Sequence, residues 1–340
     1  MVRRGAVLVL VAALLTGLLV AVAGTGAEAR PTASSGAPNQ PPVGVDDHVT
    51  AISGQALVRS APGVLGNDTD ADGQALTASI VTGAQHGLAS LQPNGAFTYT
   101  GDAGFSGYDF FVYRAFDGVE LSDPVHVWLT VMTPNEAYVT AIYEDFLDRV
   151  PEVDGRYYWS GRLDRGVETR TSFVRRMSRS HEYAVKIVKR AFTDVLGRAV
   201  DPSGREYWAN RVQARMPIAT LVLELTASNE YLTRSGGTNA GFVDTTFPAI
   251  LGRPPTAAER SARIAQLDAG GSRLAMVRGL YASVESRQRR TSAQFQLLLG
   301  RNPTAAERNE WVARLATTGD ADLAIALGAS DEYVAIAQQL

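Results

Sequence analysis

The segment Leu196–Trp208, LGRAVDPSGREYW, decides how this 340-residue chain is organised, because its pattern occurs four times. The other copies start LDR, LGR and LGR, at Leu147, Leu251 and Leu299. A second motif follows each copy at a nearly constant distance and reads SHEY, SNEY, SVES and SDEY, starting at Ser180, Ser228, Ser283 and Ser330. A sequence pattern that keeps nearly the same internal spacing in four copies predicts a structural repeat.

Apolar residues at helical spacing precede the motif in the second copy: Val188, Ala191, Phe192, Val195 and Leu196. Their i, i+3, i+4, i+7, i+8 pattern predicts the buried face of an α-helix. Gly197 is a residue type that ends helices, and Asp201-Pro202 supplies an N-cap carboxylate and a proline at the first helical position. Each copy is therefore expected to contain a helix, a tight turn and a second helix.

The third and fourth copies open the second helix with the capping-box pattern T-A-A-E, at Thr256–Glu259 and Thr304–Glu307. On the corresponding helix of the second copy, Trp208 and Val212 lie four residues apart and are expected to point inward. A third helix would lead into S-x-E-Y, whose serine and glutamate suit a capped entry into the next unit. Residues 135–340 are thus predicted to be all-helical, with two repeats at 135–233 and two at 240–340.

The amino-terminal end carries the features of an export signal. Arg3 and Arg4 precede an apolar run at Ala6–Ala23, and Ala27-Glu28-Ala29 fits the A-x-A pattern of a cleavage site. Residues 1–29 are therefore predicted to be a signal peptide, with an uncleaved membrane anchor as the alternative. Residues 30–42 are rich in Pro, Ser, Ala and Gly and are predicted to form a disordered linker.

The chain contains no cysteine, which excludes disulfides, thiol catalysis and cysteine-ligated zinc. Charge is distributed unevenly: residues 30–134 carry three Lys or Arg and ten Asp or Glu, whereas residues 135–340 carry twenty-seven and twenty-four. The acidic front part suits a cation better than a nucleic acid, so no nucleic-acid partner is expected. After signal cleavage no further segment is apolar enough to span a membrane.

Residues 43–133 change to the two-residue period of β-strands. Phe97 and Tyr99 alternate on one face, and Val125–Val131 alternates in the same way. Asn94-Gly95 lies between two such runs and is a strong β-hairpin signal. Several short strands separated by turn residues over about ninety positions predict a β-sandwich.

The loop Asn67–Gly73, NDTDADG, carries the candidate metal ligands. Asp68, Asp70 and Asp72 occupy alternate positions before a glycine, which is how a loop brings several carboxylates round one hard cation. The alternative is an acidic turn, because Asp, Asn and Gly also favour turns. The distal glutamate of a helix–loop–helix calcium site is missing, so further ligands are expected from elsewhere, such as Asp46 and Asp47 or Asp117. We therefore predict calcium as the ion.

These residues carry a resemblance to a known module. PVGVDD (42–47), GVLGNDTDADGQALTA (63–78), NGAFTYT (94–100) and GFSGYDFFVYRAFDG (104–118) resemble the bacterial immunoglobulin-like or cadherin-like modules of surface proteins. The resemblance implies a seven-stranded sandwich, a role in adhesion or spacing, and calcium at such aspartates. Only one copy is present, whereas these modules usually occur in arrays.

The helical part resembles domain-of-unknown-function family 4214, a repeat with the pattern L-G-R-x-x-D-x-x-G-x-x-Y-W that is distantly similar to phycobilisome linkers. Leu196–Trp208 matches this pattern almost throughout, whereas the first copy departs at Asp148 and the third lacks the Trp and the final Tyr. The resemblance implies an all-helical fold in secreted proteins and no established activity.

The recurring arginines of the LGR motif would either bind an anionic ligand or form a salt bridge or C-cap contact, and we favour the second; they are Arg149, Arg198, Arg253 and Arg301. The recurring tryptophans would stack on sugars or belong to the core, and their helical spacing favours the core.

The four histidines are scattered, and no common hydrolase, metalloprotease or phosphate-loop motif occurs, so the chain is predicted not to be an enzyme. The predicted function is a secreted or cell-surface binding or adhesion protein. Its expected partner is an extracellular protein or a cell-surface polymer. The alternative is a glycan-binding or enzyme-associated accessory module of a secreted cell-wall or polysaccharide system.

Overall fold

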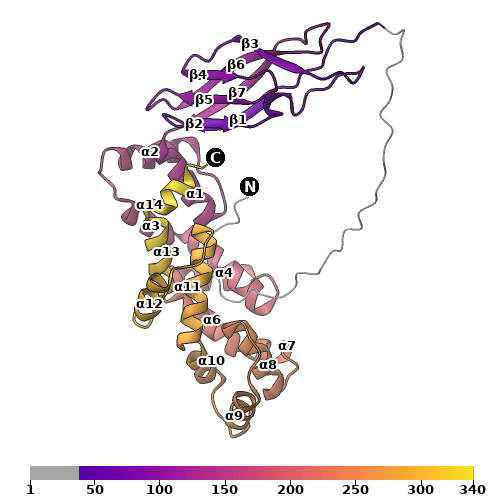
Figure 1. Cartoon of the computed structure of the whole chain (residues 1–340). Helices are drawn as coiled ribbons and strands as arrows, with labels where there is room; N and C mark the ends of the chain where they lie inside the picture. Colours follow the sequence, from indigo (N-terminus) through magenta and orange to yellow (C-terminus); the bar gives the residue numbers. More distant parts are fainter. Residues whose placement is uncertain (1–37, 340) are drawn as a thin grey trace. The chain divides into compact units, whose positions relative to one another are not determined.

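The computed structural model describes residues 38–339, which contain seven strands, one 3-10 helix and fourteen α-helices. Contacts divide this part of the chain into a β-rich unit that extends to Tyr138 and a helical unit, Val139–Ile336 (Figure 1). The predicted fold class, a β-sandwich followed by an all-α domain, is confirmed. The signal peptide predicted at 1–29 lies outside the described residues, as do residues 30–37 of the predicted linker.

The strands form two sheets that face each other (Figure 1). One has the order β1-β7-β6-β3 and the other the order β2-β5-β4. Strand β1 pairs with β7 in parallel, and every other pairing is antiparallel. The strands are β1 (Asp47–Ile52), β2 (Ala56–Arg59), β3 (Thr77–Thr82), β4 (Gly87–Leu91), β5 (Phe97–Gly101), β6 (Gly107–Phe116) and β7 (Val125–Met132), and the 3-10 helix η1 is Gly63–Leu65.

The core of the sandwich follows the alternation in the sequence. Phe97 and Tyr99 of β5 are buried, and so are the four apolar residues of β7 that share one face, Val125, Val127, Leu129 and Val131. Asn94-Gly95 forms the predicted hairpin: Leu91 pairs with Phe97, and Gly95 has φ = 84°. A Cβ on Gly95 would come within 1.9 Å of a backbone oxygen of Pro62, so this turn requires glycine.

The helical part contains four repeats of three helices each, which we call units one to four. Each keeps the order of elements expected from the sequence repeat. The first helices are α1 (Pro134–Leu147), α4 (His181–Leu196), α8 (Asn239–Leu251) and α11 (Val284–Leu299). The second helices are α2 (Val153–Asp164), α5 (Pro202–Gln213), α9 (Ala257–Asp268) and α12 (Ala305–Arg314). The third helices are α3 (Arg170–Ser178), α6 (Ile218–Ala227), α10 (Arg273–Tyr281) and α13 (Asp320–Gly328), and the short α7 (Asn229–Arg234) and α14 (Asp331–Ala337) follow α6 and α13.

The predicted turn residues have the expected conformations. Gly197 is left-handed at the end of α4, and Asp201 caps α5 by accepting a hydrogen bond from the backbone N–H of Gly204. Both T-A-A-E sequences form capping boxes. In the first unit Asp148 takes the glycine position with φ = 57°, a conformation that short polar side chains tolerate better than most.

The boundary between the second and third units differs from the other two. At the first and third boundaries S-x-E-[YS] continues directly into a sixteen-residue first helix. At the second boundary the helix stops after the six residues of α7. Gly236 and Gly237, both with positive φ, then reverse the chain before Thr238 caps α8. The repeats are therefore interrupted in the middle.

The units pair across the sequence. The third helix of unit one packs against that of unit four (α3 with α13), and the third helices of units two and three pack together (α6 with α10). Equivalent polar contacts accompany both pairs: Arg170 binds Asp331 at 2.6 Å, and Arg273 binds Asn229 at 2.5 Å. A simple solenoid would join each unit only to its neighbours in sequence, whereas here unit one also contacts unit four, the most distant in sequence.

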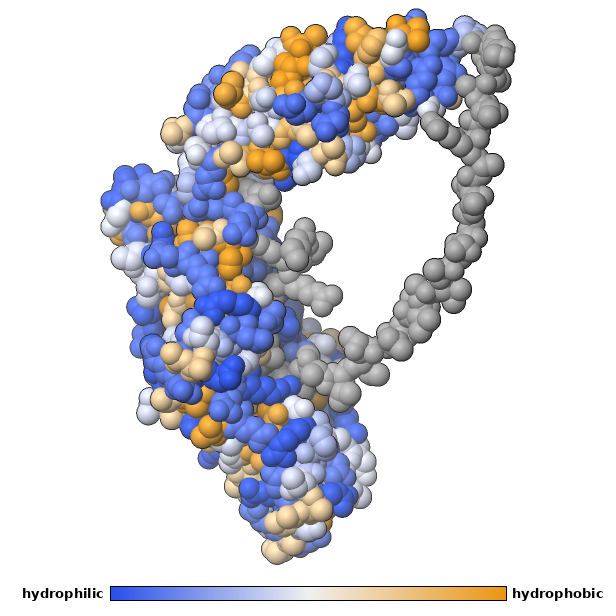
Figure 2. Space-filling model, in the orientation of Figure 1, coloured by the Kyte–Doolittle hydropathy of each residue, from blue (hydrophilic) through white to orange (hydrophobic). Residues whose placement is uncertain are grey.

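The tryptophans vary in their burial. Trp311 is buried, as predicted, whereas Trp159 and Trp208 are half-buried, so the expected inward position holds only in part for α2 and α5. The visible surface of the helical unit mixes many hydrophilic residues with smaller hydrophobic groups (Figure 2). Within residues 38–339 no helix combines the length and apolar character that crossing a membrane requires.

Candidate cation site and the repeated arginine clusters

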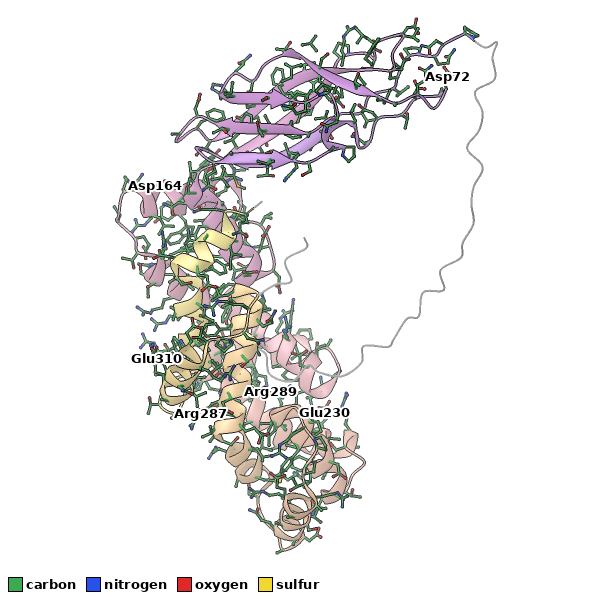
Figure 3. The ribbon with its side chains drawn as sticks, viewed as in Figure 1. Asp72, Asp164, Glu230, Arg287, Arg289 and Glu310 are labelled. Carbon is green, nitrogen blue, oxygen red and sulfur yellow. The ribbon has the colours of Figure 1, made fainter. Side chains whose placement is uncertain are left out.

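The five predicted calcium ligands lie at one end of the sandwich. Asp46 and Asp47 stand at the start of β1, and Asp68, Asp70 and Asp72 lie in the loop between η1 and β3. Asp72 is at the far tip of this loop (Figure 3). The structure assigns them three different environments.

Asp70 and Asp72 stabilise their own loop. One carboxylate oxygen of Asp70 accepts the backbone N–H groups of Asp72 and Gln74 at 3.0 and 2.9 Å. Asp72 accepts the backbone N–H of Gln40 at 2.8 Å, which ties residues of the predicted linker to the loop. These contacts match the alternative interpretation of the sequence, an acidic turn, for two of the three alternating aspartates.

Asp46 connects β1 to β7. Its carboxylate accepts the backbone N–H of His126 at 2.9 Å and the indole N–H of Trp128 at 3.1 Å. The N–H of His126, followed by that of Trp128, lowers the pKa of Asp46 below its ordinary value. This side chain is therefore a stable carboxylate at neutral pH.

Asp47 and Asp68 are the two carboxyl groups of this site whose ionised form is disfavoured. Asp68 accepts the N–H of Val45 and the hydroxyl of Tyr113, both at 2.8 Å, yet burial raises its pKa. Burial, then the charge of Asp68, then that of Asp46 raise the pKa of Asp47 to about 7. The Oδ2 atom of Asp47 is buried and has no hydrogen-bond donor within reach.

The fit to a metal ion is therefore confined to few groups. Across residues 38–339, no three His, Cys, Asp or Glu side chains converge closely enough to hold an ion by themselves. Asp117, another candidate from the sequence, is occupied by the N–H groups of Val119 and Glu120 at 2.6 and 2.7 Å. Asp47 and Asp68 remain, with Asp46 close enough to raise the pKa of Asp47, and the buried Oδ2 atom of Asp70 also has no hydrogen-bond donor.

The recurring arginine of the LGR motif has the same environment in all four units. Its guanidinium forms a bidentate ion pair with the glutamate of the following S-x-E motif, and the Nε–Oε1 distance is 2.5 Å in each. The pairs are Arg149–Glu182, Arg198–Glu230, Arg253–Glu285 and Arg301–Glu332. The salt bridge favoured from the sequence is present, and it joins the end of each first helix to the helix that begins at the following S-x-E motif, which is α4, α7, α11 or α14.

An aromatic ring six residues before each arginine completes the cluster. The guanidinium carbon lies 5.0 to 5.9 Å from the ring centroid, within the range of cation–π attraction. The rings are those of Tyr143, Phe192, Phe247 and Phe295. We call this ring, the arginine and its glutamate the arginine cluster.

A second glutamate joins the arginine cluster in three units: Glu152, Glu259 and Glu307. Arg301, followed by the N–H of Thr304, lowers the pKa of Glu307 to about 2. In the second unit Asp201 takes the capping position and accepts from Gly204 instead. Because carboxylates already neutralise these arginines, the arginine clusters act in folding and are poor candidates for ligand binding.

The serine of S-x-E-Y couples consecutive helices. Ser180 accepts the N–H of Tyr183 at 3.1 Å and donates its hydroxyl to the carbonyl of Met177 at 2.8 Å. Ser283 and Ser330 make the same pair of bonds in their units. The predicted capped entry into the next helix is therefore confirmed, and its hydroxyl also closes the preceding helix.

One recurring group escaped the sequence analysis. A basic residue six positions after the serine reaches back to the end of the preceding first helix, as Lys186, Arg234 or Arg289. Lys186 donates to the carbonyl of Asp145 at 2.9 Å, and Arg289 (labelled in Figure 3) donates to that of Ala249 at 2.7 Å. Its fixed offset was the available signal. Helix ends favour such cations because their last carbonyls lack partners.

Replacing Arg301 by alanine is expected to lower the free energy of unfolding of the helical unit by about 1 kcal/mol, a value limited by the solvent exposure of the pair. Arg301→Lys should recover less than half of the loss, because an ammonium cannot match two carboxylates bidentately. Urea unfolding in 0.1 and 1 M NaCl would measure both values. Full recovery by lysine would contradict the bidentate interpretation.

Comparison with known families agrees with both resemblances. Residues 39–133 match the family model of the bacterial cadherin-like domain. Residues 129–187 match that of a domain of unknown function, DUF4214, so this match covers the first helical unit and the start of α4. A search of curated proteins finds no match.

Proposed function

We propose that this protein is an exported, non-catalytic binding or adhesion protein at the cell surface or outside the cell. In this proposal calcium stabilises the sandwich, and the helical repeats contact an extracellular protein or a cell-surface polymer. The match to a bacterial cadherin-like domain supports a surface or adhesion-type module. The pattern of residues 1–29 supports export.

The observation that carries the calcium part is the state of Asp47. Its pKa is raised to about 7 by burial and by the neighbouring charges, and one of its oxygens is buried without a donor. A hard cation held by Asp47 and Asp68, with Asp46 beside them, would neutralise this repulsion. Backbone carbonyls or water would complete the six to eight oxygens that calcium prefers.

This geometry gives a pH dependence whose sign is fixed. The pKa of Asp47 is higher in the folded protein than its ordinary value of 3.8, so between about pH 4 and pH 7 the folded state binds more protons. Stability contributed by this group therefore falls as the pH rises through that window. Calcium needs the ionised form, so its stabilising effect should be larger at pH 8 than at pH 5.

Asp47→Asn is the variant that separates these effects. Without calcium at pH 8 it should raise the free energy of unfolding of the sandwich by about 1–2 kcal/mol, after allowance for partial exposure of the group. At pH 5 the gain should be smaller, because Asp47 is then still protonated in the folded state, and it should disappear only below about pH 4, where the unfolded state is protonated too. The calcium response should be lost at both pH values.

Thermal melting of the full-length protein in EDTA or millimolar calcium, at pH 5 and pH 8, tests the proposal. The wild type should melt higher with calcium at pH 8, because an ion that binds only the native state must stabilise it. Asp72→Asn is the matched control and should keep the response, since Asp72 binds Gln40 in its own loop. A calcium shift that survives Asp47→Asn, or no shift in the wild type, would sink the calcium part.

A further inference from the structure

Helix α5 carries an exposed aromatic and basic group that the fold does not use. Tyr207 is 55% exposed and meets Trp208 edge to face, with ring centroids 5.2 Å apart. Arg211 donates to the Tyr207 hydroxyl at 2.6 Å and lies 5.4 and 5.2 Å from the two ring centroids. Together they form a platform of two rings and a guanidinium.

Helix α2 of the first unit repeats this geometry. Tyr158 is 56% exposed and meets Trp159 edge to face at 5.0 Å, with an interplanar angle of 80° against 79° on α5. Arg162 lies 5.6 Å from the Tyr158 ring. We call these two groups, on α2 and α5, the tyrosine platforms.

The other two units show that the fold of a repeat does not need this tyrosine. The same position holds Ala262 in the third unit and Glu310 in the fourth, and α9 and α12 form there with complete capping boxes. Glu310, labelled in Figure 3, forms an exposed ion pair with Arg314, four residues on. Two of the four repeats fold without this exposed ring, so the ring is available to bind a ligand.

The two platforms differ in free charge. Arg162 is held at 3.4 Å by Glu168, a buried carboxylate. Among the ion pairs of residues 38–339 none involves Arg211, and its polar partner is the Tyr207 hydroxyl. Guanidinium groups bind carboxylates through paired donors, so α5 offers an anion site beside an exposed ring.

We propose that the tyrosine platforms bind an acidic polysaccharide, with α5 as the principal site and α2 as a second site. Tyrosine rings offer an apolar face against which a sugar ring can stack, while a polar edge remains in water. Arg211 would pair with the carboxylate of a uronic acid in the same chain. The inference rests on the proposed function, because it names the ligand class of the helical repeats.

The charge of the helical part favours a glycan over a nucleic acid. Residues 135–340 carry twenty-seven basic and twenty-four acidic residues, so the net charge is only +3. Nucleic-acid binding draws most of its strength from many phosphate contacts along a strongly basic surface. Two separate platforms with one unneutralised arginine suit a polymer with a carboxylate on each sugar.

Affinity electrophoresis of the full-length protein tests the inference, with polygalacturonate, neutral dextran or single-stranded oligothymidylate in the gel. EDTA is present so that calcium does not gel the polymer. The wild type should be retarded by polygalacturonate alone. Tyr207→Ala should weaken this binding at least about tenfold, in keeping with the effect of removing a stacking aromatic. Arg211→Gln should weaken it and reduce its salt dependence.

Tyr207→Phe keeps the ring and should retain most of the binding, and Glu310→Ala, at the equivalent position of α12, should change nothing. All variants should melt within about 2 °C of the wild type, because Tyr207 and Glu310 are exposed and Arg211 is only half-buried. Equal retardation by oligothymidylate, no retardation by polygalacturonate, or insensitivity to Tyr207→Ala would overturn the assignment. The calcium test measures melting, so the failure of one proposal can be distinguished from that of the other.

Discussion

Asp109→Ala is expected to lower the melting temperature of the sandwich by roughly 15 °C or more, corresponding to about 3–4 kcal/mol. Asp109 belongs to β6 and is 3% exposed. Its carboxylate accepts the N–H groups of Gln85, His86 and Phe110 at 2.9 to 3.0 Å and the hydroxyl of Tyr99 at 2.9 Å. One side chain thus fastens the β3–β4 connection and joins the two sheets.

The size of this effect comes from the donors that the substitution leaves behind. Each buried donor without an acceptor costs about 1–3 kcal/mol, whereas removing one donor alone costs about 1 kcal/mol. Tyr99→Phe should therefore be mild beside Asp109→Ala. Asp102→Ala, at an exposed aspartate nearby, is the control and should stay within about 0.5 kcal/mol of the wild type.

The same group gives the sandwich an acid limit. Burial alone would raise the pKa of Asp109, but its hydrogen bonds from Gln85, Tyr99, Phe110 and His86 outweigh burial and hold the pKa below the ordinary value. A lowered pKa contributes stability that is present above about pH 4 and is lost as the pH falls through the folded-state value. Melting curves from pH 2 to pH 7 should show a weaker acid dependence in Asp109→Asn. This role would be contradicted if Asp109→Asn lost melting temperature at low pH as steeply as the wild type. It would also be contradicted if Asp109→Ala melted within about 3 °C of the wild type.

The second large effect is expected in the helical unit, where Asp320→Ala should cost about 3–5 kcal/mol. Asp320 begins α13 and binds Arg290 of α11 at 2.5 Å, and the side chains of both are less than a tenth exposed. Tyr281 of α10 donates its hydroxyl to the same carboxylate. The guanidinium of Arg290 also lies 3.8 Å from the Tyr281 ring centroid.

Removing the carboxylate leaves a guanidinium and a phenol hydroxyl buried without their acceptor. The uncompensated buried charge, rather than the loss of a favourable pair, is the main cost. The double variant Arg290→Met, Asp320→Leu should therefore regain more than half of the stability that Asp320→Ala loses. Asp331→Ala removes an ion pair with Arg170 in which the carboxylate is fully exposed, so it should leave the urea midpoint almost unchanged.

Urea unfolding followed by circular dichroism at 222 nm would give these values for the helical unit. A double variant as unstable as Asp320→Ala would show that shape, and not charge, dominates the site. An Asp320→Ala protein that loses less than about 1 kcal/mol would contradict a buried ion pair altogether.

Periodicity and turn chemistry determined most of the fold. Phe97 and Tyr99 are both buried because alternate residues of a strand point to the same face of the sheet. Gly197 and Asp201 end one helix and begin the next through contacts within a few residues, so they could be read without tertiary structure. Even the arginine cluster was accessible in outline, because Arg and Glu recur at fixed offsets.

The candidate cation site was only partly accessible from the sequence. Asp68, Asp70 and Asp72 look equivalent in the loop, yet Asp70 binds its own backbone while Asp68 accepts Tyr113, forty-five residues away. Spacing along a loop does not decide which carboxylates meet, since their partners come from other strands. The raised pKa of Asp47 likewise depends on burial created by the packed sandwich.

By itself the sequence therefore determined the two fold classes, the four repeats and the caps of their helices, all of which rest on interactions between residues close together in the chain. Tertiary structure alone decided which units pair: Tyr333 of α14 donates its buried hydroxyl to Asp145 of α1 at 2.5 Å and so joins the last unit to the first. It also showed that Tyr158 and Tyr207 are exposed while Trp311 is buried. The physical reason is that a residue on a helix is buried only where another element packs against its face. The sequence pattern is almost the same in each repeat and does not show which helix faces are covered.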